Sequence, residues 1–105
     1  MVKINKLIDL CTQWSSDRGI FVNGTLQTQT LKLVSEIGEL ADNVAKQRDI
    51  ADDIGDCLVV LNNLAVMYEL SLEECLEVAY NDIKDRKGYL NGAGVFIKDS
   101  DRKVA

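Results

Sequence analysis

The chain has 105 residues, 47% of them hydrophobic and 6% aromatic, which suits one globular domain with a mostly aliphatic core. Its formal net charge of −5 argues against duplex nucleic acid as the main partner, because neutralising phosphates needs a basic surface. It has no apolar run of roughly 18 residues, which would indicate a membrane span. Its first residues lack the charged-then-apolar pattern of a secretory segment, so we do not expect one. The three cysteines stand singly, and no histidine joins them in a zinc site, so we expect reduced thiols in a cytoplasmic protein.

Helical periodicity predicts an all-α fold with four helices. The first covers about residues 4–14, and the polar cluster at 15–19 is expected to form a loop. Thr25 is expected to cap a second helix over about 26–46. The apolar positions predicted to face its core are Leu33, Ile37, Leu40 and Val44.

The third predicted helix covers about residues 50–69 and is apolar around most of its surface, which is typical of a helix in the middle of a core. Its central stripe is Ile54, Leu58, Leu61 and Ala65. Ser71 and Glu74 match a capping box that starts a fourth helix, which is expected to run to about residue 87 and stop at Gly88.

The carboxyl-terminal segment is expected to be irregular from Tyr89 onward, with a short extended stretch at residues 95–97. We expect a single domain over residues 1–98 and a flexible tail over 99–105. Short connections between the later helices favour a four-helix bundle. Because one such bundle leaves the third helix incompletely covered, we expect a homodimer or homotetramer.

Two pairs of carboxylates flank the turn between the second and third helices: Glu36 with Glu39, and Asp53 with Asp56. The members of each pair are three positions apart, so they lie about one turn apart on one side of a helix. An antiparallel hairpin would bring both pairs to the same level, where the four charges repel one another. A divalent cation removes that repulsion, and carboxylate oxygen is the ligand that magnesium and manganese prefer.

Asp56 strengthens the prediction of a metal site, because it stands in an otherwise apolar run of the third helix. A buried, unpaired carboxylate costs several kcal/mol, so it needs a cation or good hydrogen-bond donors. One alternative is that these acids lie on solvated faces and pair with lysines. A di-iron or di-manganese carboxylate bundle is disfavoured, because such sites typically use Glu-x-x-His motifs.

The segments S-E-I-G-E-L-A at residues 35–41 and I-A-D-D-I-G-D at 50–56 resemble the MazG-like all-α nucleoside triphosphate pyrophosphohydrolases. The resemblance extends to W-S-S-D-R-G at 14–19, I-K-D-R-K-G at 83–88 and G-A-G-V-F-I-K at 92–98. Two positions depart from the family pattern. Ser35 stands where the family often has a glutamate, and Asp53 replaces the usual glutamate with a side chain one methylene shorter.

The resemblance implies hydrolysis of a nucleoside triphosphate to a monophosphate and pyrophosphate. Magnesium, or manganese in its place, would be held by Glu36, Glu39, Asp53 and Asp56. Either Glu39 or Glu36 would activate the attacking water, and the sequence does not choose between them.

The resemblance also suggests substrate contacts, each with a structural alternative. The candidates for phosphate contacts are Lys32, Lys84, Arg86, Lys87 and Lys98. The basic residues near 84–87 would otherwise complement the negative end of the fourth helix, and Lys98 would otherwise be solvated. Trp14 is a candidate for stacking on the base or for packing, and Asn63 for a contact to the sugar or for a satisfied core amide.

The alternative function is a MazG-like module that binds nucleotide or protein with weakened catalysis, because Ser35 and Asp53 depart from the family pattern. A purely structural helical protein is a third possibility. It predicts that divalent ions leave thermal stability unchanged, whereas a metal that binds only the folded state raises it.

Overall fold

The computed structural model describes residues 1–101 and confirms the all-α class. The elements are α1 (Ile4–Asp17), α2 (Ile20–Asn23), α3 (Leu26–Ala45), α4 (Ala51–Met67), α5 (Leu72–Ile83), β1 (Gly88–Leu90), β2 (Phe96–Lys98) and a 3₁₀ turn at Asp99–Asp101. The chain divides into two compact units, Met1–Leu72 and Glu73–Ala105. The single domain expected over 1–98 stays a prediction, and each unit is described by itself below.

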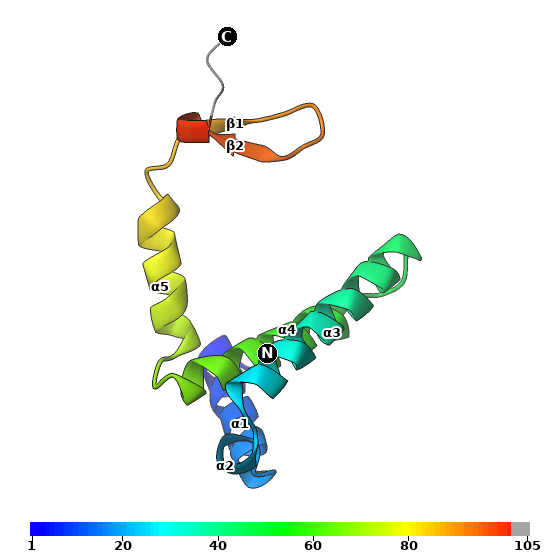
Figure 1. Ribbon diagram of the computed structural model, residues 1–105, viewed down its shortest axis with the longest axis vertical. Helices are drawn as coiled ribbons and strands as arrows, with labels where there is room; N and C mark the ends of the chain where they lie inside the picture. The colour runs from blue at the N-terminus through cyan, green and yellow to red at the C-terminus, as the bar shows by residue number, and fades with distance from the viewer. Residues whose placement is uncertain (102–105) are drawn as a thin grey trace. The chain divides into compact units, whose positions relative to one another are not determined.

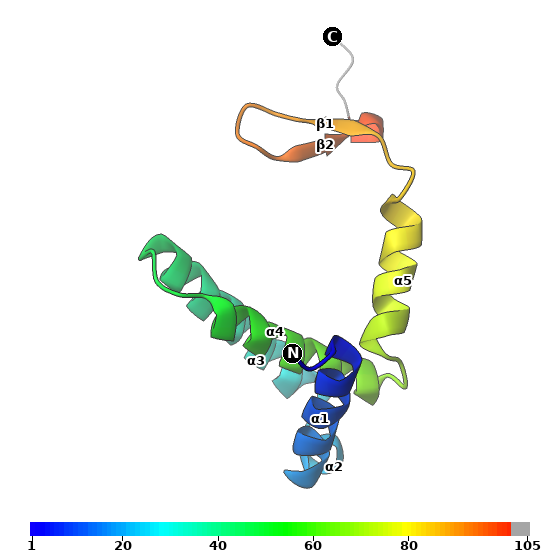
Figure 2. The ribbon, with the colours of Figure 1, turned by 180° about the vertical axis from the view of Figure 1, so that it is seen from behind.

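The first unit is built on an antiparallel hairpin of α3 and α4, which lie side by side in both views (Figures 1 and 2). Thr25 caps α3 as predicted. Its side-chain oxygen accepts a hydrogen bond from the Thr28 backbone amide at 3.0 Å, and the Thr25 backbone amide donates to the Thr28 side-chain oxygen at 3.1 Å. The turn between the helices contains Gln47 in the left-handed region, with φ of 56°. At the other end of the hairpin, α1 and α2 pack against α4.

The loop predicted at residues 15–19 is wrong for most of its length, because α1 continues to Asp17. Ser15 is fully buried, and its hydroxyl donates to Asn63 Oδ1 at 2.7 Å. Because the Ser15 hydroxyl is engaged by Asn63, it does not compete for the hydrogen bonds of the helix backbone. The chain reverses at Gly19, whose φ of 76° suits glycine, and the short α2 that follows was not predicted.

The predicted core positions of α3 and α4 are largely wrong for the single chain. Val60 and Ala65 are the buried hydrophobic residues in the described part of the chain. Ile37 and Val44 of α3 are 50% and 53% exposed, and Ile54 of α4 is 46% exposed. The reason is that the two helices meet along polar side chains, described below, so their apolar stripes lie beside the contact.

In the second unit, α5 begins after Ser71 as predicted but ends at Ile83, four residues before the predicted end. The predicted irregular segment after Tyr89 is wrong, because β1 and β2 form an antiparallel hairpin there. The extended stretch expected at 95–97 overlaps β2. Of the tail predicted to be flexible, Asp99–Asp101 forms a 3₁₀ turn, and 102–105 lie outside the described residues.

No single helix in residues 1–101 is long and apolar enough to cross a membrane.

Candidate acidic site on the helical hairpin

Two amide hydrogen bonds show how α3 is aligned with α4. Asn43 Nδ2 donates to Asp53 Oδ2 at 2.9 Å near the turn, and Asn63 Nδ2 donates to Gln29 Oε1 at 3.0 Å farther from it. Glu36 lies midway between Gln29 and Asn43, seven residues from each. Seven residues are two helical turns, so these three side chains follow one line along α3. Glu36, Glu39 and Asp56 therefore lie between the two amide contacts along the hairpin, and Asp53 takes part in one of them.

Glu36 is the most deeply buried of the four carboxylates, with 6% of its surface exposed. Its Oε1 forms an ion pair with Lys32 Nζ at 2.9 Å, and Lys32 lies one turn earlier on the same helix. Its Oε2 is buried and has no hydrogen-bond partner. A buried carboxylate oxygen without a donor is costly, so this atom is available for a cation.

Glu39 is exposed, whereas Asp56 is partly buried on α4. The negative charge of Glu36 is the main cause that raises the pKa of Glu39 above its ordinary value, followed by desolvation and by the hydrogen bond that a protonated Glu39 makes to the Glu36 side chain. Desolvation is the main cause that raises the pKa of Asp56, followed by the charges of Asp52, Glu36 and Asp53. The charges of Glu36 and Asp53 therefore contribute to the raised pKa of both Glu39 and Asp56.

Asp53 is 8% exposed, and the Asn43 amide holds its side chain. Among residues 1–101, no three acidic or cysteine side chains are already grouped as metal ligands. Joint coordination of one ion by all four carboxylates therefore stays a prediction. The shared negative charge and the unpartnered oxygen of Glu36 both fit a divalent cation, whose preferred ligands are carboxylate oxygens.

Three predicted substrate contacts belong to the same unit as the acids. Lys32 is engaged by Glu36, and its side chain is 57% exposed. Asn63 is 3% exposed, and both ends of its amide are occupied by Ser15 and Gln29, which favours the alternative of a core amide. Trp14 is 48% exposed, and the Arg18 guanidinium lies 4.2 Å from its ring centre.

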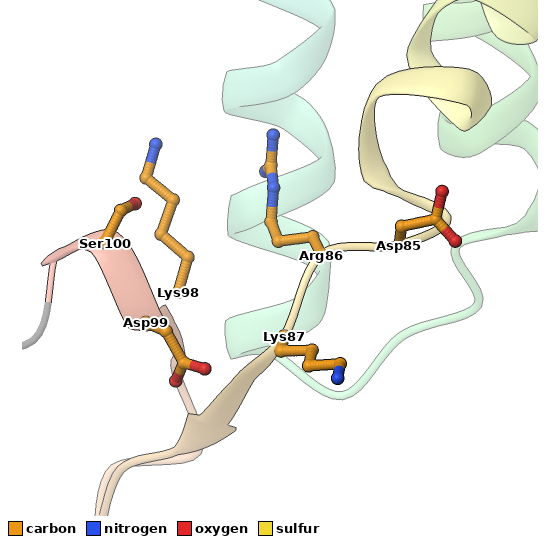
Figure 3. Close-up of a pocket in the computed structure, with 6 residues that line it drawn as sticks. All are labelled: Asp85, Arg86, Lys87, Lys98, Asp99 and Ser100. Atoms are coloured by element: carbon orange, nitrogen blue, oxygen red, sulfur yellow. The ribbon is translucent and has the colours of Figure 1, made fainter.

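The other predicted phosphate contacts lie in the second unit. Lys84 follows the end of α5 and is exposed. Arg86, Lys87 and Lys98 line a pocket of about 390 Å³ together with Asp85, Asp99 and Ser100 (Figure 3). The structure thus brings three of the basic candidates together around the β-hairpin.

Sequence reasoning missed Asn43, Gln29 and Ser15, which hold the helices around the acids. A signal for the first two was present, because Gln29, Glu36 and Asn43 recur at intervals of seven residues. No local pattern marks Ser15, since its partner Asn63 lies 48 residues away.

Comparison with known proteins bears on this arrangement. The family model of the MazG nucleotide pyrophosphohydrolase domain matches residues 24–90, which include both acidic pairs. The chain is 43% identical over 67 residues to an uncharacterized 18.2 kDa protein in the rep-hol intergenic region of Haemophilus phage HP1. That match covers 62% of this chain and 41% of the phage protein. No solved structure matches the chain. Because the family model covers more than half of its length, the chain belongs to the MazG nucleotide pyrophosphohydrolase family.

Proposed function

We propose that the chain is a nucleoside triphosphate pyrophosphohydrolase that depends on magnesium, or on manganese in its place. It would add water across the α–β phosphoanhydride of a (d)NTP and release a monophosphate and pyrophosphate, and so act in control of the nucleotide pool. The observation that carries the proposal is the partnerless, buried Oε2 of Glu36 among three further carboxylates.

The acidic site has a defined part in this reaction. Glu36, Glu39, Asp53 and Asp56 would hold the cation, which supplies neutralisation of the phosphate charge and polarisation of water. Glu39 suits the role of base, because it is exposed and its pKa is raised. Glu36 is the other candidate. Its burial and its ion pair with Lys32 suit a positioning role equally well.

The remaining predicted contacts, Asn63 excepted, keep their proposed roles in binding substrate. Lys32, Lys84, Arg86 and Lys98 would contact phosphates, as point charges or, for arginine, through two parallel donors. Trp14 would stack on the base through the ring face that Arg18 does not cover. Asn63 would act through helix packing, because its amide is already engaged.

The test is a panel of canonical and modified (d)NTPs incubated with the protein and Mg²⁺ or Mn²⁺, with products identified by ³¹P NMR. We expect equal amounts of monophosphate and pyrophosphate from at least one nucleotide, and no turnover in EDTA. Glu39→Ala and Asp56→Ala should abolish turnover while leaving the helical circular dichroism unchanged. The matched control is Glu77→Gln, which alters an exposed acid of α5. A full panel without monophosphate would refute the proposal.

The second candidate is a module that binds nucleotide without hydrolysing it. It is favoured by one observation, namely that the carboxylates are not pre-grouped as metal ligands in the described residues. Metal-dependent binding of a nucleotide in calorimetry, with no product after prolonged incubation, would support this candidate over the enzyme.

A further inference from the structure

Lys32 forms an ion pair with an acid that solvent hardly reaches. Its Nζ lies 2.9 Å from Glu36 Oε1, and the Glu36 side chain is 8% exposed. By contrast, Asp42 and Asp82, which pair with basic residues one turn later, expose 57% and 72% of their side chains. Such exposed pairs are ordinary features of a helix surface. The pair of Lys32 with Glu36 instead brings a positive charge to a buried carboxylate.

The order of the two residues along α3 also sets this pair apart. On a helix, an acid four residues before a base is the more favourable order, because the acid then lies nearer the amino-terminal end. Asp42 and Lys46 follow that order, whereas Lys32 precedes Glu36. The pair therefore contributes less to the helix than to the acidic site beside it.

The charge of Lys32 acts on three carboxylates of the acidic site. The hydrogen bond to Glu36 and the charge of Glu36 are the main causes that raise the pKa of Lys32, and the charges of Glu39 and Asp56 add to them, against the opposing effect of desolvation. In turn, the charge of Lys32 opposes the rise in the pKa of Glu39 and of Asp56. One ammonium group thus partly balances three negative charges.

A divalent cation and the Lys32 ammonium compete for the same carboxylate. Oε1 of Glu36 is paired with Lys32, and the buried Oε2 has no partner. A cation held by Glu36 brings two positive charges close to the ammonium, and like charges at short range repel. The cation also binds several carboxylate oxygens at once, whereas an ammonium is a single compact charge. Because the Lys32 side chain is flexible and 57% exposed, it leaves Glu36 for water at little cost.

We propose that Lys32 is the internal counterion of the acidic site and that a divalent cation displaces its ammonium from Glu36. The effect is reciprocal, because Lys32 weakens the binding of the cation and the cation frees Lys32. This exchange requires only the acidic site. That the freed ammonium then contacts a substrate phosphate, so that this contact forms only after the cation has bound, rests on the proposed function.

NMR of ¹⁵N-labelled lysine ammonium groups in the full chain follows the displacement directly. In EDTA, the Lys32 ammonium, assigned by the loss of its signal in Lys32→Gln, should exchange its protons slowly because it is bonded to Glu36. Saturating Mg²⁺ should bring it to the fast exchange of a solvated lysine. Lys46, bonded at 2.7 Å to the exposed Asp42, is the control and should not respond. A Lys32 signal that saturating Mg²⁺ leaves unchanged would overturn the proposal.

Affinity for Mn²⁺ in the absence of nucleotide, measured by electron paramagnetic resonance, tests the competition. Lys32→Gln should tighten Mn²⁺ binding about tenfold, because the ion no longer has to break a charge-assisted contact. Lys46→Gln removes the same charge just beyond the end of α3 and should change the affinity less than twofold. Lys32→Arg keeps the charge and should stay near the wild type. Unchanged or weaker binding by Lys32→Gln, equal tightening by Lys46→Gln, or no binding by the wild type at millimolar Mn²⁺ would each refute the competition.

Urea unfolding separates a counterion from a residue that only supports the helix. In EDTA, Lys32→Gln should be less stable than the wild type, because three acids lose their counterion. Saturating Mg²⁺ should stabilise the variant more than the wild type, since a tighter ligand of the folded state stabilises it more. A deficit of the same size with and without Mg²⁺ would mean that Lys32 serves the helix alone.

These measurements contain no nucleotide, so the exchange and the proposed enzyme can fail separately. Tighter Mn²⁺ binding by Lys32→Gln without turnover of any nucleotide by the wild type would refute the enzyme and support the exchange. Turnover by the wild type with unchanged Mn²⁺ affinity in Lys32→Gln would refute the exchange and support the enzyme.

Discussion

Glu36 combines features that stability alone does not explain. The side chain is buried, one oxygen is paired with an exposed lysine, and the other oxygen has no donor. Desolvating a carboxylate costs several kcal/mol, and a single ion pair to an exposed partner returns little of it. Its charge also raises the pKa of Glu39 and contributes to the raised pKa of Asp56. Such a residue is best understood as part of a site that binds positive charge.

Glu36→Gln should therefore change how stability depends on pH. Because the folded chain keeps the protons of Glu39 and Asp56 at higher pH than the unfolded chain does, stability is lost as pH rises from their ordinary pKa values, 4.5 and 3.8, toward their folded values. Removing the charge of Glu36 lowers both folded pKa values. In EDTA, the variant should therefore lose less stability than the wild type as pH rises from about 4 toward neutrality, as urea midpoints would show.

A constant difference between the two proteins across that pH range would contradict the electrostatic coupling. Glu77→Gln serves as the control, because it removes an exposed acid from the second unit and should follow the wild-type curve. Adding Mg²⁺ should restore stability to the wild type more than to Glu36→Gln, since a cation that binds only the folded state stabilises it.

Asn43 is expected to position Asp53, because its amide donates to Asp53 Oδ2 at 2.9 Å. Asn43→Ala should cost about 1 kcal/mol of stability from the lost hydrogen bond. It should also weaken Mn²⁺ binding several-fold, measured by electron paramagnetic resonance. Gln27→Ala on the exposed side of the same helix is the control. Unchanged Mn²⁺ affinity in Asn43→Ala would mean that the bond serves packing alone.

At the scale of elements, side-chain hydrogen bonds join α3 to α4 at two levels. The Asn43 amide donates to Asp53, and the Asn63 amide donates to Gln29. Polar pairs of defined geometry fix the register of two helices, because any slip leaves buried groups without partners. The same hydrogen bonds set how Glu36 and Glu39 of α3 lie relative to Asp53 and Asp56 of α4.

The Ser15–Asn63–Gln29 network joins α1, α4 and α3 and should behave cooperatively. Ser15→Ala should destabilise the protein by about 1–3 kcal/mol, because it leaves Asn63 Oδ1 buried without a donor. Asn63→Ala should cost at least as much. In the double variant the two effects should fall short of additivity by about 0.5–3 kcal/mol in a double-mutant cycle of chemical unfolding. Simple additivity would show that the bond contributes no coupling.

The sequence supported part of this fold and not the rest, for identifiable reasons. Periodicity located α3 and α4, and spacing paired Glu36 with the acids of α4, because both depend on local order. Ser15 was assigned to a loop, since its helical state depends on a partner 48 residues away. The β-hairpin after α5 was missed because its strands have three residues each, too few for alternation to be detected. Periodicity identified the apolar side of α3 and of α4, but it did not show that the two helices contact each other through polar side chains.

At the scale of the molecule, the exposed apolar surface of the first unit calls for a partner. On α3, Leu31, Val34 and Ile37 are 69%, 63% and 50% exposed, and on α4, Leu58 and Leu61 are 45% and 38% exposed. Leu31, Val34 and Ile37 follow one another at intervals of three residues, so they lie on one side of α3, and soluble monomers rarely expose large apolar patches. Fully burying an exposed side chain of this size contributes about 1.5–3 kcal/mol, and these half-exposed side chains would contribute a part of that each toward an interface.

We therefore predict that the chain forms a dimer or tetramer through the exposed side of α3, measurable by sedimentation at micromolar concentration. Leu31→Glu and Val34→Glu should each shift the assembly toward monomer, because a buried carboxylate in an apolar interface lacks a partner. Gln27→Glu adds the same charge at an exposed polar position of α3 and should leave the assembly unchanged. If the wild type sediments as a monomer up to about 100 μM, where interfaces of standard size are normally formed, this face is not a contact between copies.

The same variants show whether the proposed turnover needs the assembly. If Leu31→Glu dissociates the assembly and turnover persists, the acidic hairpin of one chain is sufficient for catalysis. If turnover is lost with the assembly, the site requires both copies.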